Sequence, residues 1–240
     1  MKNKPLIVAN WKATKTIKET IEWAKQTKPA LEENNSETIV ICPPYTSIPF
    51  VASLFKDTNI KIGAQNVAKF KKGAYTGEVT AEMLDGLVDY CIIGHSERRK
   101  FFGETDDDVI QKAELLLQFQ ITPILCVSDL GQLDSYSNRG KFIIDKSDEI
   151  VFVYEPPGAI SGGGAYRPED PEIASTNTRK MEKKIGRKAM ILYGGSVNPE
   201  NVVRFLSKEN IDGALIGQAS TDPQTFLELL NSIKLNGVVD

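Results

Sequence analysis

Short apolar runs rich in β-branched residues recur along the 240-residue chain, and segments with helical spacing separate most of them. Each run ends in a polar or glycine-rich turn. There are eight: Pro5–Asn10, Thr38–Pro43, Ile60–Gln65, Tyr90–Gly94, Thr122–Val127, Ile150–Glu155, Met190–Gly195 and Gly213–Gly217. The runs are apolar along their length, which is typical of parallel strands buried on both faces. Their alternation with helices predicts a parallel sheet.

Eight strand–helix units in a chain of this length favour an α/β fold of the closed (β/α)8 barrel type. A doubly wound open sheet is the alternative that the pattern alone leaves open. The segment Asp129–Glu149 contains two glycines and a weak helix signal, so we expect a shortened or irregular connection between strands 5 and 6. Linkers and low-complexity segments are absent from the sequence, which predicts one domain over residues 1–240.

Composition and charge exclude several classes of function. The net charge of −3 and the sequence pI near 5.5 argue against nucleic acid as a main partner. The apolar stretch near the N-terminus is too short for a signal peptide or a membrane span. Three cysteines are scattered without metal-ligand spacing, which indicates reduced thiols. We therefore expect a cytoplasmic protein with neither a nucleic-acid nor a membrane partner.

Polar side chains follow several of the predicted strands at the point where each strand ends. Asn10 and Lys12 follow the first run, His95 and Glu97 follow the fourth, and Glu155 ends the sixth. The C-terminal ends of barrel strands form one rim, where the active sites of barrel enzymes lie. A carboxylate can remove a proton beside a carbonyl, a histidine can polarise the oxygen, and a cation can stabilise an enediolate. The set predicts proton transfer next to a carbonyl group.

Two glycine-bearing turns follow the last two runs, at Gly194–Ser196 and at Gly217–Gln218. Backbone N–H groups in such turns bind phosphate in many barrels. The predicted substrate is therefore a small phosphorylated aldehyde or ketone, and the chemistry requires neither a metal ion nor an organic cofactor. Each feature also has a structural explanation, because a single histidine is often structural and glycines form tight turns. Their common position on one rim favours the functional interpretation.

The motifs that carry these residues resemble the triosephosphate isomerase family and follow its order over nearly the whole chain. The matching strings are ANWK (Ala9–Lys12), GAQNV (Gly63–Val67), GAYTGEV (Gly73–Val79), IIGHSERRKFFGE (Ile92–Glu104), YEP (Tyr154–Pro156), YGGSVNPEN (Tyr193–Asn201) and DGALIGQAS (Asp212–Ser220). The string GHSERR followed by FGE is highly specific. The resemblance implies interconversion of dihydroxyacetone phosphate and D-glyceraldehyde 3-phosphate in glycolysis and gluconeogenesis.

The resemblance also implies a role for each residue of the rim. Glu155 would be the base that moves the proton between C1 and C2, and His95 the neutral electrophile. Lys12 would be the cation that meets the substrate, with Asn10 beside it at the oxyanion and Glu97 as a second acid near the lysine.

Further positions are implied for the phosphate and for assembly. The implied phosphate-binding residues are Ser161, Gly195, Ser196, Gly217 and Gln218. The segment around Thr76 resembles the loop that reaches into a neighbouring subunit, which implies a homodimer. The shortened chain also resembles members that assemble further, so a tetramer is the alternative.

Departures from the family pattern concentrate around the phosphate. The family's lid reads PVWAIGTGK, whereas Pro156–Gly164 reads PPGAISGGG. Gly158 replaces the lid tryptophan, Gly162 replaces the threonine that latches the closed lid, and Gln218 replaces the second glycine of the phosphate turn. Glycines in a hinge increase the entropy lost on closure.

These departures leave two alternatives to the isomerase. One is a catalytically weakened member that acts as a sugar-phosphate binding protein. The other is a different sugar-phosphate barrel enzyme, in which GHSERR would be out of place. Joint retention of Lys12, His95 and Glu155 favours the isomerase, because a binding protein has little need for all three.

Overall fold

Eight parallel strands close into a barrel in the computed structural model, which describes residues 4–156, 158–159, 167–186 and 189–236. The strand order follows the chain, and β1 pairs with both β2 and β8. The strands are β1 (Leu6–Asn10), β2 (Thr38–Cys42), β3 (Lys61–Ala64), β4 (Tyr90–Ile93), β5 (Thr122–Val127), β6 (Val151–Tyr154), β7 (Met190–Tyr193) and β8 (Gly213–Ile216). Each strand falls within one of the eight predicted runs. The closed barrel is confirmed, and the open sheet is excluded.

Alternate residues of most strands enter two different apolar cores. Leu6 and Val8 of β1 belong to the smaller cluster inside the barrel, with residues such as Val153 of β6. Ile7 and Ala9 belong to the larger cluster between the barrel and its helices. Successive side chains of a strand point to opposite faces, so a strand that is covered on both faces must be apolar at every position. This explains the continuous apolar runs in the sequence.

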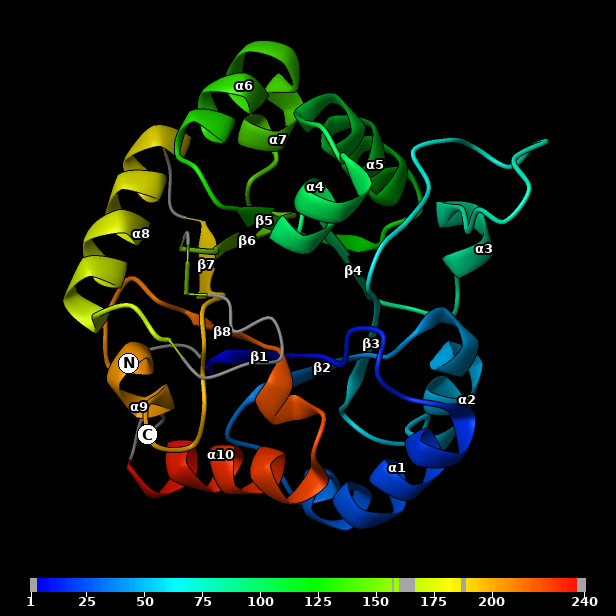
Figure 1. Ribbon diagram of the computed structural model, residues 1–240, viewed down its shortest axis with the longest axis vertical. Helices are drawn as coiled ribbons and strands as arrows, with labels where there is room; N and C mark the ends of the chain where they lie inside the picture. Colours follow the sequence, from blue (N-terminus) through cyan, green and yellow to red (C-terminus); the bar gives the residue numbers. More distant parts are fainter. Residues whose placement is uncertain (1–3, 157, 160–166, 187–188, 237–240) are drawn as a thin grey trace.

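The helices surround the barrel (Figure 1), and local sequence signals fix the starts of the longest ones. Thr16 and Thr105 form capping boxes with Glu19 and Asp108. The helical elements are α1 (Ile17–Glu32), η1 (Tyr45–Ser47), α2 (Ile48–Leu54), α3 (Ala81–Leu84), α4 (Ser96–Phe102), α5 (Asp106–Gln118), α6 (Gly131–Arg139), α7 (Lys141–Asp145), α8 (Pro171–Ile185), α9 (Val202–Leu206), η2 (Gln218–Ser220) and α10 (Pro223–Leu235). Within the described residues, each helix is too short or too polar to cross a membrane.

The connection between β5 and β6 is more helical than its sequence predicts. Two short helices, α6 and α7, fill it and are separated at Gly140. A Cβ atom at Gly140 would lie 2.8 Å from Cγ1 of Ile110 on α5, so only glycine allows this close approach. The glycine between the two helices explains why the helix signal in this part of the sequence is weak. Packing against α5 decides the helical state, which propensity alone did not show.

The loop from β3 to α3 projects from the barrel beside α3 (Figure 1). Phe70 and Tyr75 stack within it, with ring centroids 4.3 Å apart. At its base, Lys69 Nζ lies 2.6 Å from Asp108 Oδ1 of α5. Thr76 lies exposed in this loop, so it takes no part in the barrel rim. The loop therefore presents an ordered, partly aromatic surface to the outside.

Candidate active site

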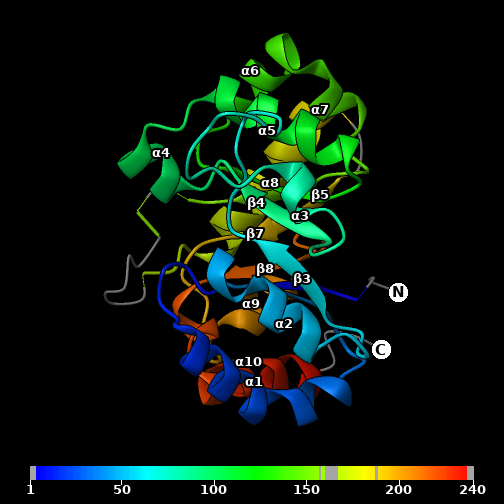
Figure 2. The same cartoon turned by 90° about the vertical axis from the view of Figure 1, so that its right-hand side faces the viewer.

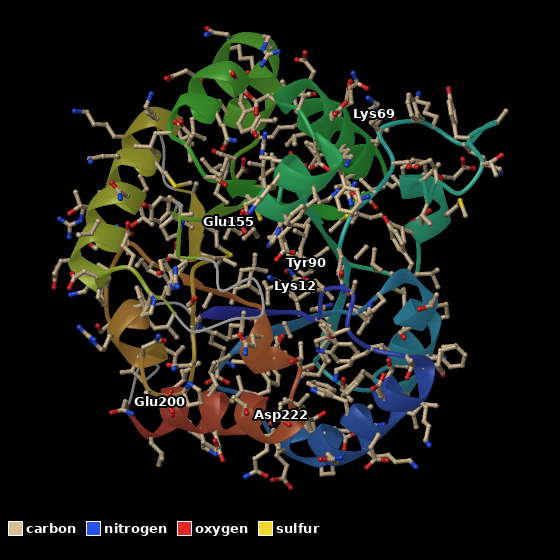
Figure 3. The ribbon with its side chains drawn as sticks, in the orientation of Figure 1. Lys12, Lys69, Tyr90, Glu155, Glu200 and Asp222 are labelled. Atoms are coloured by element: carbon tan, nitrogen blue, oxygen red, sulfur yellow. The ribbon has the colours of Figure 1, made fainter. Side chains whose placement is uncertain are left out.

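Most of the predicted residues line one cleft at the C-terminal ends of the strands, and Glu155 and Glu97 lie behind its walls against His95 and Lys12. The volume of the cleft is about 390 Å³, and it opens to solvent. Among the described residues it is lined by Asn10, Lys12, His95, Gly194, Gly195, Ser196, Val197, Leu215, Gly217 and Gln218. Lys12 and Glu155 lie toward the centre of the barrel in Figure 3, and α4, which begins after His95, lies on one side of the barrel in Figure 2. The structure thus brings residues from β1, β4, β6, β7 and β8 to one rim.

Lys12 is held in an uncommon backbone conformation at the mouth of β1. Its φ of 52° lies in the left-handed region, which non-glycine residues adopt rarely and at a cost. Its N–H donates to Asn10 Oδ1 at 3.1 Å, and its carbonyl accepts from Gln65 Nε2 at 2.9 Å. Its Nζ donates to Glu97 Oε1 at 2.5 Å. Three different segments therefore fix where this cation points.

Gln65 is a site residue that the sequence reasoning left without a role. Its amide donates both to the carbonyl of Lys12 and to the carbonyl of Cys42, each at 2.9 Å. It ties the loop after β1 to the end of β2 and stabilises the strained conformation of Lys12. The available signal was its position directly after the third apolar run, inside the string GAQNV.

His95 has a defined tautomer in this structure. The residue is 6% exposed, and its Nδ1 accepts the backbone N–H of Glu97 at 3.2 Å at the start of α4. An acceptor nitrogen carries no proton, so a neutral imidazole carries its proton on Nε2. Nε2 faces the carboxylate of Glu155, with 3.1 Å between Nε2 and Oε1. The ring therefore presents an N–H donor to the site.

Glu155 is fully buried, but only half of its carboxylate is paired. Oε2 accepts the backbone N–H of Ser96 at 2.8 Å. Oε1 lies near His95 without the alignment of a hydrogen bond, so it has no hydrogen-bond partner among the described residues. A buried carboxylate oxygen without a partner is costly. Such an oxygen is a strong candidate for direct interaction with a ligand.

The glycines of the turn after β7 are required by packing beside this carboxylate. A Cβ atom at Gly194 would lie 2.5 Å from Val153 Cγ1 and 3.1 Å from Glu155 Cγ. At Gly195, a Cβ atom would overlap the hydroxyl of Tyr193. Close packing explains both glycines without reference to phosphate, although it leaves their N–H groups in the cleft wall.

Ser196 forms hydrogen bonds with the segment that follows β6. Its N–H and its hydroxyl both donate to the carbonyl of Ala159, at 2.8 and 2.7 Å. Both donors are thus occupied by protein in this structure. Ala159 follows Gly158, which adopts a φ of 82°, and this conformation would strain the tryptophan that the family pattern has there.

The turn after β8 is packed against the lysine. A Cβ atom at Gly217 would lie 3.2 Å from Lys12 Cε. Gln218 begins η2 and contributes its exposed side chain to the cleft. Predicted residues Ser161 and Gly162 lie outside the described residues.

The three buried cysteines are not candidates for this chemistry. Burial raises the pKa of the thiols of Cys42, Cys91 and Cys126, so all three stay protonated. The described ranges contain no group of three or more His, Cys, Asp or Glu side chains that could hold a metal ion. The titratable candidates at the rim are therefore Glu155, His95, Lys12 and Glu97.

A closed barrel with a carboxylate, a histidine and a lysine around one rim cleft defines the class of (β/α)8 enzymes built for acid–base chemistry. Comparison with known proteins identifies the family. The family described as Triosephosphate isomerase matches residues 5–233. The chain belongs to the triosephosphate isomerase family.

Individual relatives support this assignment over almost their whole length. Triosephosphate isomerase of Dictyoglomus thermophilum is 40% identical over 248 residues, which cover 95% of this chain and 98% of the relative. The enzymes of Dictyoglomus turgidum and Solibacter usitatus are each 38% identical and cover 95% of this chain, with 98% and 99% of the relatives covered.

Proposed function

We propose that the chain interconverts dihydroxyacetone phosphate and D-glyceraldehyde 3-phosphate, with Glu155 as the base. The observation that carries the proposal is the buried carboxylate oxygen Oε1 of Glu155, which lacks a hydrogen-bond partner among the described residues and faces the Nε2 of His95. Membership of an isomerase family supports the same reaction. A sugar-phosphate binding role has no comparable support.

Proton transfer alone accounts for the reaction. Glu155 takes the proton from C1 of the ketone, and the electron pair of the broken C–H bond forms the C1–C2 double bond of an enediolate. Nε2–H of His95 donates to the substrate oxygens as negative charge develops on them. The proton returns from Glu155 to C2, and transfer of a proton between the two oxygens completes the aldehyde. No electrons are gained or lost overall.

Lys12 stabilises the enediolate by its charge, and its neighbours orient it. Glu97 holds Nζ at 2.5 Å, while Asn10 and Gln65 fix the backbone of the lysine. Asn10 lines the cleft beside the lysine, where its amide can donate to the same oxygen. The cation is therefore in place before substrate arrives, which lowers the cost of reorganisation during the reaction.

The substrate phosphate binds at the turns after β7 and β8 and competes with a contact inside the protein. Gly195, Ser196, Gly217 and Gln218 supply the backbone and side-chain groups of this pocket, and Ser161 is proposed as a further donor. Because the N–H and the hydroxyl of Ser196 both donate to the carbonyl of Ala159, a phosphate that accepts from Ser196 displaces that carbonyl. Occupancy of the phosphate pocket is thereby coupled to the segment that begins at Pro156.

Assembly, location and pathway complete the proposal. The loop around Thr76 projects outward, and Tyr75 and Phe102 are 45% and 71% exposed. An aromatic surface of this kind suits a second copy of the chain, so we propose a homodimer, with a tetramer as the alternative that light scattering would distinguish. The protein would act in the cytoplasm, in glycolysis and gluconeogenesis, as one domain.

A coupled assay with glyceraldehyde 3-phosphate tests the reaction. Glu155→Gln keeps the shape of the side chain but removes the base, so turnover should fall about 10²- to 10⁴-fold. Glu149→Gln is the matched control, because Glu149 is half exposed and pairs with Lys146 away from the cleft. Turnover that survives in Glu155→Gln would remove this residue from the mechanism. Absent turnover in the wild-type protein, with glycerol 3-phosphate still bound, would support the binding role instead.

A further inference from the structure

Both peptide groups of Gly94, the residue before His95, are bound by charged side chains. The N–H donates to Glu104 Oε1 at 2.8 Å, and the carbonyl accepts from Arg99 Nε at 2.9 Å. Gly94 adopts a φ of 71°, and a Cβ atom there would lie 3.2 Å from Arg99 Nη2. The guanidinium thus packs directly against the glycine. The backbone that leads into His95 is held from two sides.

Arg99 is itself fixed by α5 and by α6, the first helix of the connection between β5 and β6. Its Nη2 donates to Tyr136 Oη of α6 at 2.8 Å, and its Nη1 donates to Asp106 Oδ1 of α5 at 2.9 Å. A guanidinium is planar, so three donors with three separate acceptors leave it one orientation. Asp106 also lies near Arg139, which anchors the end of α6 to the same site.

The hydroxyl of Tyr136 is a polar group in apolar surroundings. The side chain of this tyrosine is fully buried in the larger apolar core. Burial raises the pKa of Tyr136, so the hydroxyl remains protonated and accepts from Arg99 as a neutral group. A buried hydroxyl group needs a hydrogen-bond partner, and the oxygen of Tyr136 accepts from Nη2 of Arg99.

We infer that Tyr136 is a positioning residue for His95, acting through Arg99 and the carbonyl of Gly94. The inference rests on the proposed function, in which Nε2 of His95 must stay within hydrogen-bond reach of the substrate oxygens. Loss of the hydrogen bond to Tyr136 allows the guanidinium of Arg99 to change its orientation, which weakens its hydrogen bond to the carbonyl of Gly94. Displacements well below 1 Å in a reacting geometry lower turnover measurably. The irregular connection after β5 thereby affects the active site from outside the barrel.

Tyr136→Phe tests this role, and the single histidine of the chain supplies a clean probe. With 15N-labelled imidazole, one pair of ring-nitrogen signals reports the tautomer and surroundings of His95. We expect both signals to shift in Tyr136→Phe, and kcat to fall about three- to tenfold with KM changed less than twofold. Ile143→Val is the matched control: it removes one buried methyl group from α7 in the same connection and leaves Arg99 untouched. In that control, the signals and kcat should stay at wild-type values.

Arg99→Lys provides the second variant. It should shift the His95 signals by itself, and adding Tyr136→Phe should then have no further effect, because the two residues act in one chain of contacts. Unchanged His95 signals in Tyr136→Phe, equal effects in Ile143→Val, or additive effects in the double variant would each overturn the inference. If Tyr136→Phe does not fold, Arg99→Lys decides alone: an unshifted His95 signal refutes the role. Wild-type protein without turnover but with the expected shifts would refute the proposed function and leave the positioning role intact.

Discussion

Lys112→Met is expected to reduce the free energy of unfolding by about 3 kcal/mol, because it leaves a buried carboxylate short of a partner. Lys112 Nζ lies 2.6 Å from Glu104 Oε2, and the two side chains are 6% and 2% exposed. Removing one partner of a buried ion pair costs about 3–5 kcal/mol. The lower end applies here, since Arg98 still donates to Glu104 Oε2 at 2.6 Å.

Urea unfolding at fixed protein concentration, followed by circular dichroism, measures this loss. Lys184→Met is the matched control: Lys184 pairs with Asp134 on the surface, and an exposed pair contributes about 0–1 kcal/mol. The same 3 kcal/mol should lower the melting temperature by about 6–12 °C. Equal losses in the two variants would show that burial of the Glu104 pair does not determine its contribution.

The pH dependence gives the same prediction a second readout. Burial alone would raise the pKa of Glu104, but Lys112 and Arg98 bring that pKa below its ordinary value of 4.5. A carboxyl whose pKa is lower in the folded state adds stability above its unfolded pKa, and that stability disappears as pH falls through the folded pKa. In Lys112→Met the folded pKa of Glu104 rises. Acid unfolding should therefore begin at a higher pH than in the wild type, and an unchanged acid transition would refute the reasoning.

Two further substitutions test contacts that the sequence did not reveal. Gln65→Met removes the two hydrogen bonds that hold the loop of Lys12. We expect kcat/KM in the coupled assay to fall about tenfold, with little change in the melting temperature. Normal kinetics would make Gln65 a purely structural residue. Gly140→Ala places a Cβ atom 2.8 Å from Ile110 Cγ1. The free energy of unfolding in urea should therefore fall by about 1–3 kcal/mol. An unchanged free energy of unfolding would mean that α6 and α7 can shift against α5.

Much of the fold could be predicted from the sequence because its signals are local. A strand that is covered on both faces must be apolar at every position, so the eight runs predicted both the number of strands and their positions. Barrel topology then places all strand ends on one rim, which is why Asn10, Lys12, His95 and Glu155 could be grouped from their order alone. The start of α5 also depends on a local signal, because Thr105 and Asp108 form a capping box there.

The tertiary structure decided the contacts between distant parts of the chain. Oε2 of Glu155 accepts from Ser96, 59 residues away, and the hydroxyl of Ser196 donates to Ala159, 37 residues away. The helical state of the segment after β5 depended on packing at Gly140, which a weak local propensity concealed. Pattern and propensity describe neighbours along the chain, whereas these pairings depend on which side chains the closed barrel brings within hydrogen-bond distance. For that reason the sequence predicted which polar side chains meet at the rim, and only the folded chain showed how each of them is held.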